Sequence, residues 1–424
     1  MSPMASRDLD IVLFGATGFV GALTAAHLAE QVGAGVRIAL AGRSRSKLEA
    51  LRTELGAPAR AWELVEVDAR DASGLRALAR RTTVLASTVG PYAVHGKEVV
   101  RACAEQGTHY ADLTGELLFV RWSLDEVAER ARETGARIVH ACGFDSIPSD
   151  LGVLVTAERA AADGAGTLAD TTLVVRSMKG GLSGGTIDSG RQEAITSRAD
   201  AAARRAMSDP YGLSPRRSEE PSTGRDRPSG PVATLRRLVP VERDPASGRW
   251  SGPFVMASFN TRIVRLSNTL TDWSYGRTLR YREVVDFGSS PVSPLLAGGM
   301  AIGLGAGRAG LAYTPTRTIL DRFLPKPGEG PSAAQRAAGR FRMEIRSTTT
   351  TGARYRTTVG ADYDPGYDGS AIMLGQSALC LAFDGERLPA RAGVLTPATA
   401  MGDVLVERLR ARAFTFDVEP VERA

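Results

Sequence analysis

Short apolar runs alternate with longer mixed stretches over the first 150 residues of the chain. The runs that predict buried strands lie at 9–14, 36–41, 62–67, 83–88, 108–112 and 137–142. Stretches between them, such as 97–106 and 116–134, predict helices. Strands that alternate with helices in this way are typical of a doubly wound parallel sheet. We therefore predict an α/β domain over residues 1–150, with its ligand at the carboxyl ends of the strands.

After residue 150 the pattern changes to that of an antiparallel sheet. Strands are predicted at 171–179 and 278–287, and a hairpin at 340–362 turns at Gly352. Apolar and charged residues alternate through the first strand of this hairpin, which is typical of a sheet with one solvated face. We predict a second, α+β domain over residues 151–393, built on a mainly antiparallel sheet and used for substrate binding or oligomerisation.

Three other segments have a recognisable pattern. Residues 366–384 are apolar nearly all round and predict a buried helix. Residues 208–231 are rich in Pro, Ser, Arg and Glu and predict a mobile loop. A C-terminal helix at about 394–424 is expected to return to the first domain.

The segment 295–326 combines an apolar part with a basic part. Its first nineteen residues, 295–313, contain six glycines and the single charge of Arg308. Burying that charge in a bilayer costs about 2.5–3.5 kcal/mol, so a membrane span is disfavoured. Residues 316–326 then mix apolar and basic side chains. Two interpretations stay open: peripheral contact with a membrane or a lipid substrate, or a helix packed on the second domain or on the partner of a homodimer.

A glycine-rich loop follows the first predicted strand. Gly15, Gly18 and Gly21 are spaced G-x-x-G-x-x-G between a strand and a helix. Such a loop lets backbone N–H groups approach a diphosphate at the helix N-terminus, although a tight turn alone would also use glycine. We therefore predict a dinucleotide-binding Rossmann domain. The cofactor contacts expected in this loop are Gly15, Thr17, Gly18, Phe19, Val20 and Gly21.

The end of the second strand indicates which dinucleotide binds. An NAD site usually has an acidic residue here for the ribose 2′-hydroxyl, but no acid occurs before Glu49. Arg43 and Ser44 stand in its place and are suited to a 2′-phosphate. The cofactor predicted is therefore NADPH. The alternative is that these residues only begin a solvated helix, with Ser44 as its N-cap.

Further cofactor contacts are expected at the ends of the third and fourth strands. They are Asp68, Ser87, Thr88, Gly90 and Pro91. Asp68 has two interpretations, as an acceptor for the adenine amino group or as the cap of the next helix.

Composition narrows the class of protein. The chain has 424 residues, 43% hydrophobic and 24% charged, which favours a globular protein of two domains. Its net charge of +6 rests almost wholly on arginine, and no nucleic-acid-binding motif accompanies it, so no nucleic-acid partner is predicted. The three cysteines and four histidines show neither a disulfide pattern nor metal-ligand spacing. Without a signal peptide, a cytoplasmic location is expected, with contact at the inner face of the membrane as an extension.

Several longer motifs resemble a known family. The chain lacks the Tyr-x-x-x-Lys of short-chain dehydrogenases. Segments 15–21, 89–96, 102–116 and 142–152 resemble instead the saccharopine dehydrogenase-like oxidoreductases. Segments 324–331 and 373–380 are similar to the actinobacterial branch called trans-acting enoyl reductases. The resemblance implies NADPH-dependent reduction of an enoyl double bond in a polyketide or lipid acyl chain, which a carrier protein or separate synthase holds.

Candidate catalytic residues follow the fourth and sixth strands. Tyr92 and Ser146 are candidate donors to a developing negative charge, and His95 and Tyr92 are candidate acids. Asp145 and Ser146, at the end of the sixth strand, are expected to face the substrate. Each of these residues has a structural alternative: Tyr92 as a rim aromatic, His95 as a surface or capping residue, and Asp145, Ser146 and Ser149 as caps of the next helix.

Two other functions remain open from the sequence. A saccharopine-type reductase of an amino-acid imine would need cations for substrate carboxylates, for which Arg176, Lys179 and Arg191 are candidates. The other alternative is a non-catalytic, lipid-associated protein that keeps the nucleotide-binding fold.

Overall fold

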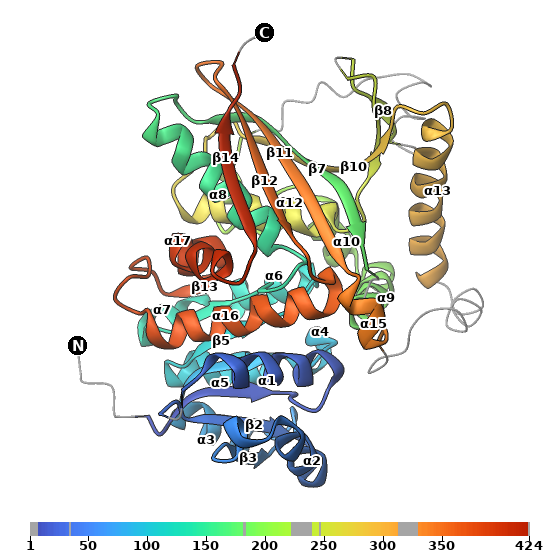
Figure 1. Ribbon diagram of the computed structural model, residues 1–424. Coiled ribbons are helices and arrows are strands. Elements are labelled where there is room, and N and C mark those ends of the chain that lie inside the picture. The colour runs from blue at the N-terminus through green and yellow to red at the C-terminus, as the bar shows by residue number, and fades with distance from the viewer. Residues whose placement is uncertain are drawn as a thin grey trace.

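The computed structural model describes residues 7–33, 35–180, 184–221, 240–245, 247–312 and 330–422. They form two seven-stranded sheets, with sheet A in the lower half of Figure 1 and sheet B in the upper half. The predicted amphipathic stretch 316–326 and residues 222–231 of the predicted loop lie outside the described residues.

Sheet A is parallel throughout, with the strand order β13-β6-β5-β4-β1-β2-β3. Its strands are β1 (Leu9–Phe14), β2 (Ile38–Gly42), β3 (Glu63–Glu66), β4 (Thr82–Ser87), β5 (His109–Asp112), β6 (Arg137–Val139) and β13 (Gly393–Leu395). Ile11, Val12 and Leu13 of the central strand β1 are fully buried because both faces of the sheet are covered. The predicted doubly wound α/β sheet is confirmed.

The helices of the first half are α1 (Phe19–Gln31), α2 (Arg45–Leu55), α3 (Ala72–Arg81), α4 (Tyr92–His95), α5 (Lys97–Gln106), α6 (Leu117–Glu126) and α7 (Ala128–Thr134). On one side of the sheet α5 packs between α3 and α7, whereas α1 packs beside a helix from the end of the chain, α16 (Ser370–Phe383). Figure 1 shows α1 and α16 running side by side between the two sheets.

Sheet B has the order β14-β12-β11-β7-β10-β9-β8. Its strands are β7 (Leu168–Lys179), β8 (Glu242–Arg243), β9 (Trp250–Pro253), β10 (Arg280–Gly288), β11 (Arg340–Thr349), β12 (Arg354–Ala361) and β14 (Thr415–Pro420). All neighbours are antiparallel except β7 and β10. The predicted hairpin is β11 and β12, and Phe341, Met343 and Ile345 of β11 are buried on one face as their alternation predicts.

The C-terminal region contains the expected helix but is not a single helix over residues 394–424. It contains the edge strand β13 of sheet A, helix α17 (Pro397–Arg410) and strand β14 of sheet B. A strand as short as β13 carries too few residues to show a period of two. The prediction was therefore wrong for β13 and β14, because their pairing depends on partners far away in the sequence.

The other helices of the second half are α8 (Ile147–Ala162), α9 (Gly184–Ala199), α10 (Ala201–Ser208), α12 (Ala257–Leu270), α13 (Ser293–Ala312) and α15 (Ala333–Ala337). Helix α8 leads from sheet A to sheet B, where it packs against β11, β12 and β14. Gly152 allows this close approach, because a Cβ atom there would lie 2.5 Å from Cδ1 of Ile345.

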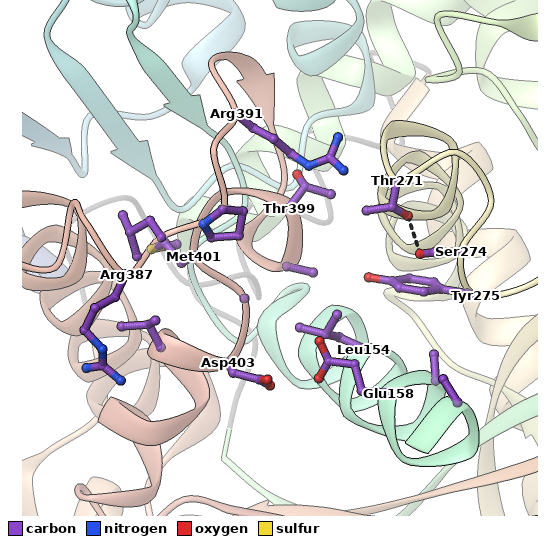
Figure 2. Close-up of a pocket in the computed structure, with 17 residues that line it drawn as sticks. Leu154, Glu158, Thr271, Ser274, Tyr275, Arg387, Arg391, Thr399, Met401 and Asp403 are labelled. Atoms are coloured by element: carbon purple, nitrogen blue, oxygen red, sulfur yellow. Dashed lines mark hydrogen bonds between the residues drawn. The ribbon is translucent and has the colours of Figure 1, made fainter. Parts of the chain in front are cut away.

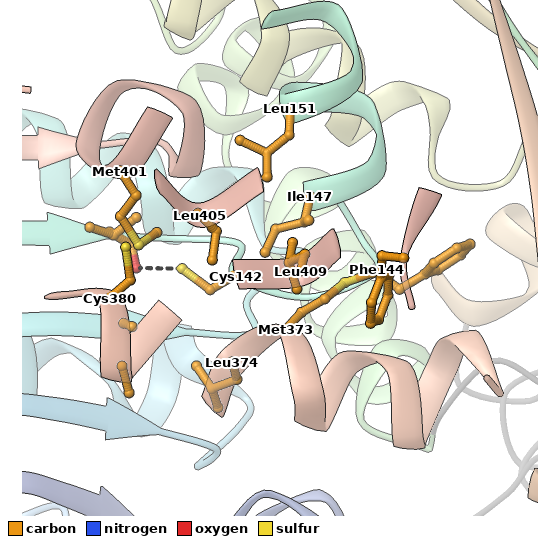
Figure 3. Close-up of a cluster of buried hydrophobic side chains, with 14 of the residues drawn as sticks. Cys142, Phe144, Ile147, Leu151, Met373, Leu374, Cys380, Met401, Leu405 and Leu409 are labelled. Atoms are coloured by element: carbon orange, nitrogen blue, oxygen red, sulfur yellow. Dashed lines mark hydrogen bonds between the residues drawn. The ribbon is translucent and has the colours of Figure 1, made fainter. Parts of the chain in front are cut away.

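A continuous core joins the sheets (Figure 3). Phe144, Ile147 and Leu151 enter it from the start of α8, and side chains of α16 and α17 complete it. Leu405 of α17 is fully buried there. The two halves are therefore held together largely by the hydrophobic effect.

The first part of the predicted mobile loop is packed against the protein. Tyr211 and Leu213 are buried. The Arg216 guanidinium lies 4.2 Å from the centre of the Trp273 ring, and Glu220 accepts a hydrogen bond from the indole N–H at 3.1 Å. Residues 208–221 are therefore ordered by contacts with α12 and the turn after it, which the polar composition of the segment does not reveal.

Helix α13 contains most of the apolar segment 295–313. Ala297 and Ala301 of this helix are buried, whereas the side chains of Leu295 and Ile302 are 75% and 61% exposed. In the part of the chain that the structure describes, no helix is long and apolar enough to cross a membrane. One face of this helix is therefore apolar and exposed.

Replacing a core residue between the sheets will show how strongly they are coupled. Leu405→Ala is expected to lower the free energy of unfolding by about 2–5 kcal/mol, because it removes buried apolar contacts and leaves a cavity. The matched control Leu295→Ala, at an exposed position, should change it by about 0.5 kcal/mol or less. Urea unfolding followed by circular dichroism measures both. Equal effects in the two variants would contradict this core.

Candidate functional site

The loop between β1 and α1 has a geometry that requires glycine. Gly15 has φ of +86°, and a Cβ atom there would lie 2.6 Å from Cγ2 of Val89. A Cβ atom on Gly21 would lie 2.2 Å from the carbonyl oxygen of Gly15. The loop therefore folds tightly onto the start of α1, which brings its backbone N–H groups to the carboxyl edge of sheet A.

The first turn of α1 lacks a side-chain cap because its N-cap residue is Gly18. N–H groups in a first turn have no partner within their helix. Together with the helix dipole, they form a binding site for an anionic group. Thr17 is exposed beside this turn, and its hydroxyl lies near the end of β2. These features fit a dinucleotide diphosphate.

Of the other two predicted loop residues, Phe19 faces the second half of the molecule, whereas the contact of Val20 lies within α1. The Phe19 ring packs edge-on against Tyr367, with ring centres 5.1 Å apart, and the Arg336 guanidinium lies 5.3 Å from its centre. The carbonyl of Val20 accepts a hydrogen bond from Thr24 inside α1. The Phe19 side chain thus fixes the loop to the region around α15.

Arg43 lies at the end of β2 with its side chain exposed, and it makes no ion pair with any described residue. The neighbouring Arg45 is instead held by Glu49 and by the carbonyl of Leu64. Ser44 caps α2 by accepting a hydrogen bond from the N–H of Lys47 at 3.5 Å. The cap predicted as the alternative is therefore present, and Arg43 still has a guanidinium available for a phosphate.

The ends of β3 and β4 surround the same loop. Asp71, rather than Asp68, caps α3, and Asp68 accepts a hydrogen bond from the N–H of Arg70. Thr88 donates from its hydroxyl to the carbonyl of Gly15 at 3.0 Å, and the Ser87 hydroxyl accepts from the N–H of Val89 at 3.3 Å. Gly90 and Pro91 complete the turn into α4. The structure thus brings the predicted cofactor residues to one edge of sheet A.

Tyr92 is buried and its hydroxyl is fully engaged. It donates to the carbonyl of Ser87 at 3.1 Å and accepts from the N–H of Leu113 at 3.2 Å. Burial and the charge of Asp112 hold its pKa well above the usual range, so the phenol stays protonated. This geometry fastens the ends of β4 and β5 to each other.

His95 lies at the end of α4. The charged groups around it are not those around Tyr92 and Ser146. Burial and the positive charges of Arg70 and Arg43 lower its pKa, against the opposing effect of Asp68. The imidazole is therefore neutral at pH 7 and belongs to the nucleotide end of the site rather than to the end near α8.

Ser146 belongs to a buried polar chain that links the two halves. Its hydroxyl donates to the side-chain oxygen of Asn260 at 3.1 Å, and the Asn260 amide donates to Glu283 at 3.0 Å. Tyr281 donates to the other oxygen of Glu283 at 2.8 Å. Burial raises the pKa of Glu283 to about 7. Ser146 is also the N-cap of α8, but its side chain does not cap the helix.

Glu116 has a role that its sequence position does not show. Its two carboxylate oxygens accept hydrogen bonds from the N–H groups of Tyr92 and Ala93 at 2.7 and 2.8 Å. Ser189 of α9 donates to the same carboxylate at 2.7 Å. The residue lies directly before α6, but its side chain caps α4 and connects it to α9.

Asp145 follows β6 at the carboxyl edge of sheet A. Its carboxyl group lacks a hydrogen-bond partner among the described residues. A Cβ atom on Gly115 would lie 3.7 Å from its Oδ2 and 3.5 Å from the methyl group of Met256. Burial raises the pKa of Asp145 to about 7, with no hydrogen bond to offset it. The carboxyl group can therefore both hold and release a proton near neutral pH. Its place after a predicted strand was the only signal in the sequence.

A buried Ser–His–Asp arrangement lies behind these loops. The Nδ1 atom of His140 is 2.8 Å from Asp112, and its Nε2 atom is 2.9 Å from the hydroxyl of Ser123. All three side chains are at most 1% exposed. Asp112 also accepts hydrogen bonds from the N–H groups of Thr114 and Ala141. The arrangement positions the ends of β5 and β6 and offers no surface to a substrate.

Comparisons with known proteins agree with this geometry. Residues 11–139 match the family model described as saccharopine dehydrogenase NADP binding domain. This match supports NADP(H) as the cofactor. Saccharopine dehydrogenase (L-Glu forming) from Saccharomyces cerevisiae has a similar fold, with a TM-score of 0.55 at 14% identity over 97% of this chain and 99% of that one.

Relatives in mycobacteria are much closer in sequence. A protein of Mycobacterium tuberculosis is 50% identical over 411 residues, which cover 96% of both chains. Trans-acting enoyl reductases of Mycobacterium ulcerans and Mycobacterium bovis are each 47% identical, over 96% of this chain and 96% and 97% of theirs. The chain belongs to the saccharopine dehydrogenase-like family of NADP-dependent oxidoreductases, in the branch of the trans-acting enoyl reductases.

Proposed function

We propose that the protein uses NADPH to reduce the enoyl double bond of a polyketide or lipid acyl chain, in trans to the synthase that carries this chain. The observation that supports it most is the carboxyl edge of sheet A, which carries the uncapped N-terminus of α1, an Arg43 without an ion pair among the described residues and, further along the same edge, the carboxyl group of Asp145. The names of the mycobacterial relatives support the same reaction.

The chain supplies specific groups for the cofactor. N–H groups of the first turn of α1 would hold the diphosphate, and Arg43 would bind the 2′-phosphate. Asp68 would accept a hydrogen bond from the adenine amino group, a role that capping by Asp71 leaves open. His95 would lie beside the nucleotide as a neutral side chain, given its neighbours Arg43 and Arg70.

The reaction adds a hydride and a proton across the double bond. Bound NADPH supplies the hydride, which adds to the β-carbon of the acyl thioester. We assign the proton for the α-carbon to Asp145, whose carboxyl group holds it at neutral pH because burial raises the pKa to about 7. Tyr92 and Ser146 use their hydroxyl protons in hydrogen bonds to Ser87 and Asn260, so we assign them to positioning the loops.

The exposed face of α13 supports an apolar partner. Leu295, Leu296 and Ile302 are all more than half exposed on this helix. We propose that the segment 295–326 makes peripheral contact with lipid. The protein itself would then be cytoplasmic and would touch the inner surface of the membrane. A homodimer that buries the same face is the other proposal for this surface, and light scattering distinguishes the two.

An amino-acid imine is less well supported as the substrate. Arg176, a cation that a dicarboxylate substrate would require, is paired with Asp286 at 2.5 Å and Glu344 at 3.0 Å. The direct test compares NADPH oxidation on a panel of carrier-bound enoyl chains with oxidation on an imine of lysine. Turnover on an enoyl chain supports the proposal. Turnover on the imine alone, or binding to lipid vesicles without any turnover, contradicts it.

Arg43→Ala is expected to weaken NADPH binding by about 10- to 100-fold, because it removes a charge-assisted contact of about 1.5–3 kcal/mol with the 2′-phosphate. Binding of NADH, which lacks this phosphate, should not change. The matched control is Arg45→Ala. Arg45 lies two residues after Arg43, and its guanidinium is held by Glu49 and by the carbonyl of Leu64. Fluorescence titration measures all of these affinities. An unchanged preference for NADPH in the Arg43 variant would show that the 2′-phosphate binds elsewhere.

Asp145→Asn is expected to lower kcat for enoyl reduction by about 10²- to 10⁴-fold, with NADPH affinity unchanged, because an amide cannot supply the proton. The raised pKa fixes the sign of the pH dependence in the unmodified protein. Its kcat should fall as the pH rises through about 7, since the protonated carboxyl group is then lost. The variant should lack this decline. A full kcat in the variant, or a rate that rises through this range, would rule out Asp145 as the donor.

A further inference from the structure

A pocket lies away from the coenzyme loop (Figure 2). Its volume is about 510 Å³, and it is bordered by α8, the turn after α12, the loop between α16 and β13, and α17. In that loop the carbonyl of Pro389 accepts a hydrogen bond from Arg137, the first residue of β6, at 3.1 Å. The pocket therefore reaches the amino end of a strand, whereas the coenzyme loop lies at the carboxyl ends, and no predicted coenzyme residue lines it.

Two carboxyl groups face each other across this pocket. Glu158 comes from α8 and Asp403 from α17, and Figure 2 shows their side chains turned toward one another. Both residues are exposed at the edge of the pocket, and partial burial of the carboxyl group, a hydrogen bond to Asp403 and the charge of Asp403 together raise the pKa of Glu158. A cation placed between the two groups would therefore be favourable, because it offsets the repulsion between their negative charges.

The arginines at the rim are occupied by other groups. Arg387 forms an ion pair with Glu407 at 2.5 Å. Arg391 donates a hydrogen bond to the carbonyl of Leu270. Each guanidinium is thus held outside the acid pair, which leaves the two carboxyl groups to a ligand.

Tyr275 provides an independent indication of a ligand. Its side chain is 2% exposed and points into the pocket in Figure 2. Its hydroxyl has no hydrogen-bond partner among the described residues. A buried polar atom without a partner is unfavourable, so a polar group of a ligand in this pocket would stabilise it.

The rest of the lining is mainly apolar, with Thr271, Ser274 and Thr399 as its other polar residues. Leu154, Ala157 and Ala161 lie along one face of α8, and Pro389 and Met401 face them from the other side. Next to Met401, α17 is interrupted at Gly402, whose φ of +54° is a conformation that favours glycine. The pocket thus joins an acidic end to a surface suited to a hydrocarbon chain.

We propose that this pocket binds a primary alkylammonium ion, with its –NH3⁺ group between Glu158, Asp403 and Tyr275 and its chain against the apolar face of α8. An ammonium group has three N–H donors. The two carboxylates and the phenol oxygen are three acceptors for them. The proposal is independent of the reductase reaction.

Isothermal titration calorimetry with hexylamine at constant pH tests this site, with hexan-1-ol and hexanoate as uncharged and anionic controls. Hexylamine should bind, and each control should bind at least about tenfold more weakly, because only the ammonium group pairs with the carboxylates. Saturation with NADPH should leave hexylamine binding unchanged. Failure of the reductase proposal would therefore not affect this result.

Variants identify the groups responsible. Glu158→Gln and Asp403→Asn should each weaken hexylamine binding about tenfold or more, and Tyr275→Phe about three- to tenfold. Glu386→Gln, an exposed acid in the bordering loop that does not line the pocket, should have no effect. Hexan-1-ol binding as tightly as hexylamine to the unmodified protein would overturn the proposal without any variant. Equal affinities in Tyr275→Phe, Glu386→Gln and the unmodified protein would also overturn it.

Discussion

The backbone N–H groups at the start of α1, which have no partner among the described residues, are the feature on which the functional site depends. They remain available because Gly18 provides no side-chain cap and because Gly15 and Gly21 pack too closely for any other residue. A helix N-terminus of this kind attracts an anion through its dipole and its free donors together. Thr88 then ties the loop to the end of β4, so the anion site and the strand ends that surround it form one unit.

The second half of the chain is built onto this unit. Helix α16 packs beside α1, Tyr367 and Arg336 contact Phe19, and Ser189 reaches the carboxylate of Glu116 that caps α4. Strand β13 extends sheet A, and β14 extends sheet B. Sheet B and its helices therefore help to fix the positions of the cofactor loops. This explains why a continuous apolar core between the sheets matters for the site.

Local patterns made much of the fold predictable. The strands of sheet A are short, apolar runs buried on both faces, and the hairpin of β11 and β12 alternates strictly, so each carries its own signal. Strands β13 and β14 and the ordered segment 208–221 depend on contacts with distant residues, which no local period records. The cofactor loop was predictable because glycine spacing reflects backbone geometry. The Asp145 carboxyl group, which has no hydrogen-bond partner in the described part of the chain, and the cap formed by Glu116 were not predictable, because both follow from which groups tertiary packing brings near them.

A crystal structure of the protein with NADP⁺ would test the central claim most directly. The diphosphate should lie on the N–H groups at the start of α1, with the 2′-phosphate within hydrogen-bond distance of the Arg43 guanidinium and the nicotinamide ring toward Asp145. A diphosphate bound away from α1, or a 2′-phosphate that contacts other side chains and leaves Arg43 free, would contradict the account.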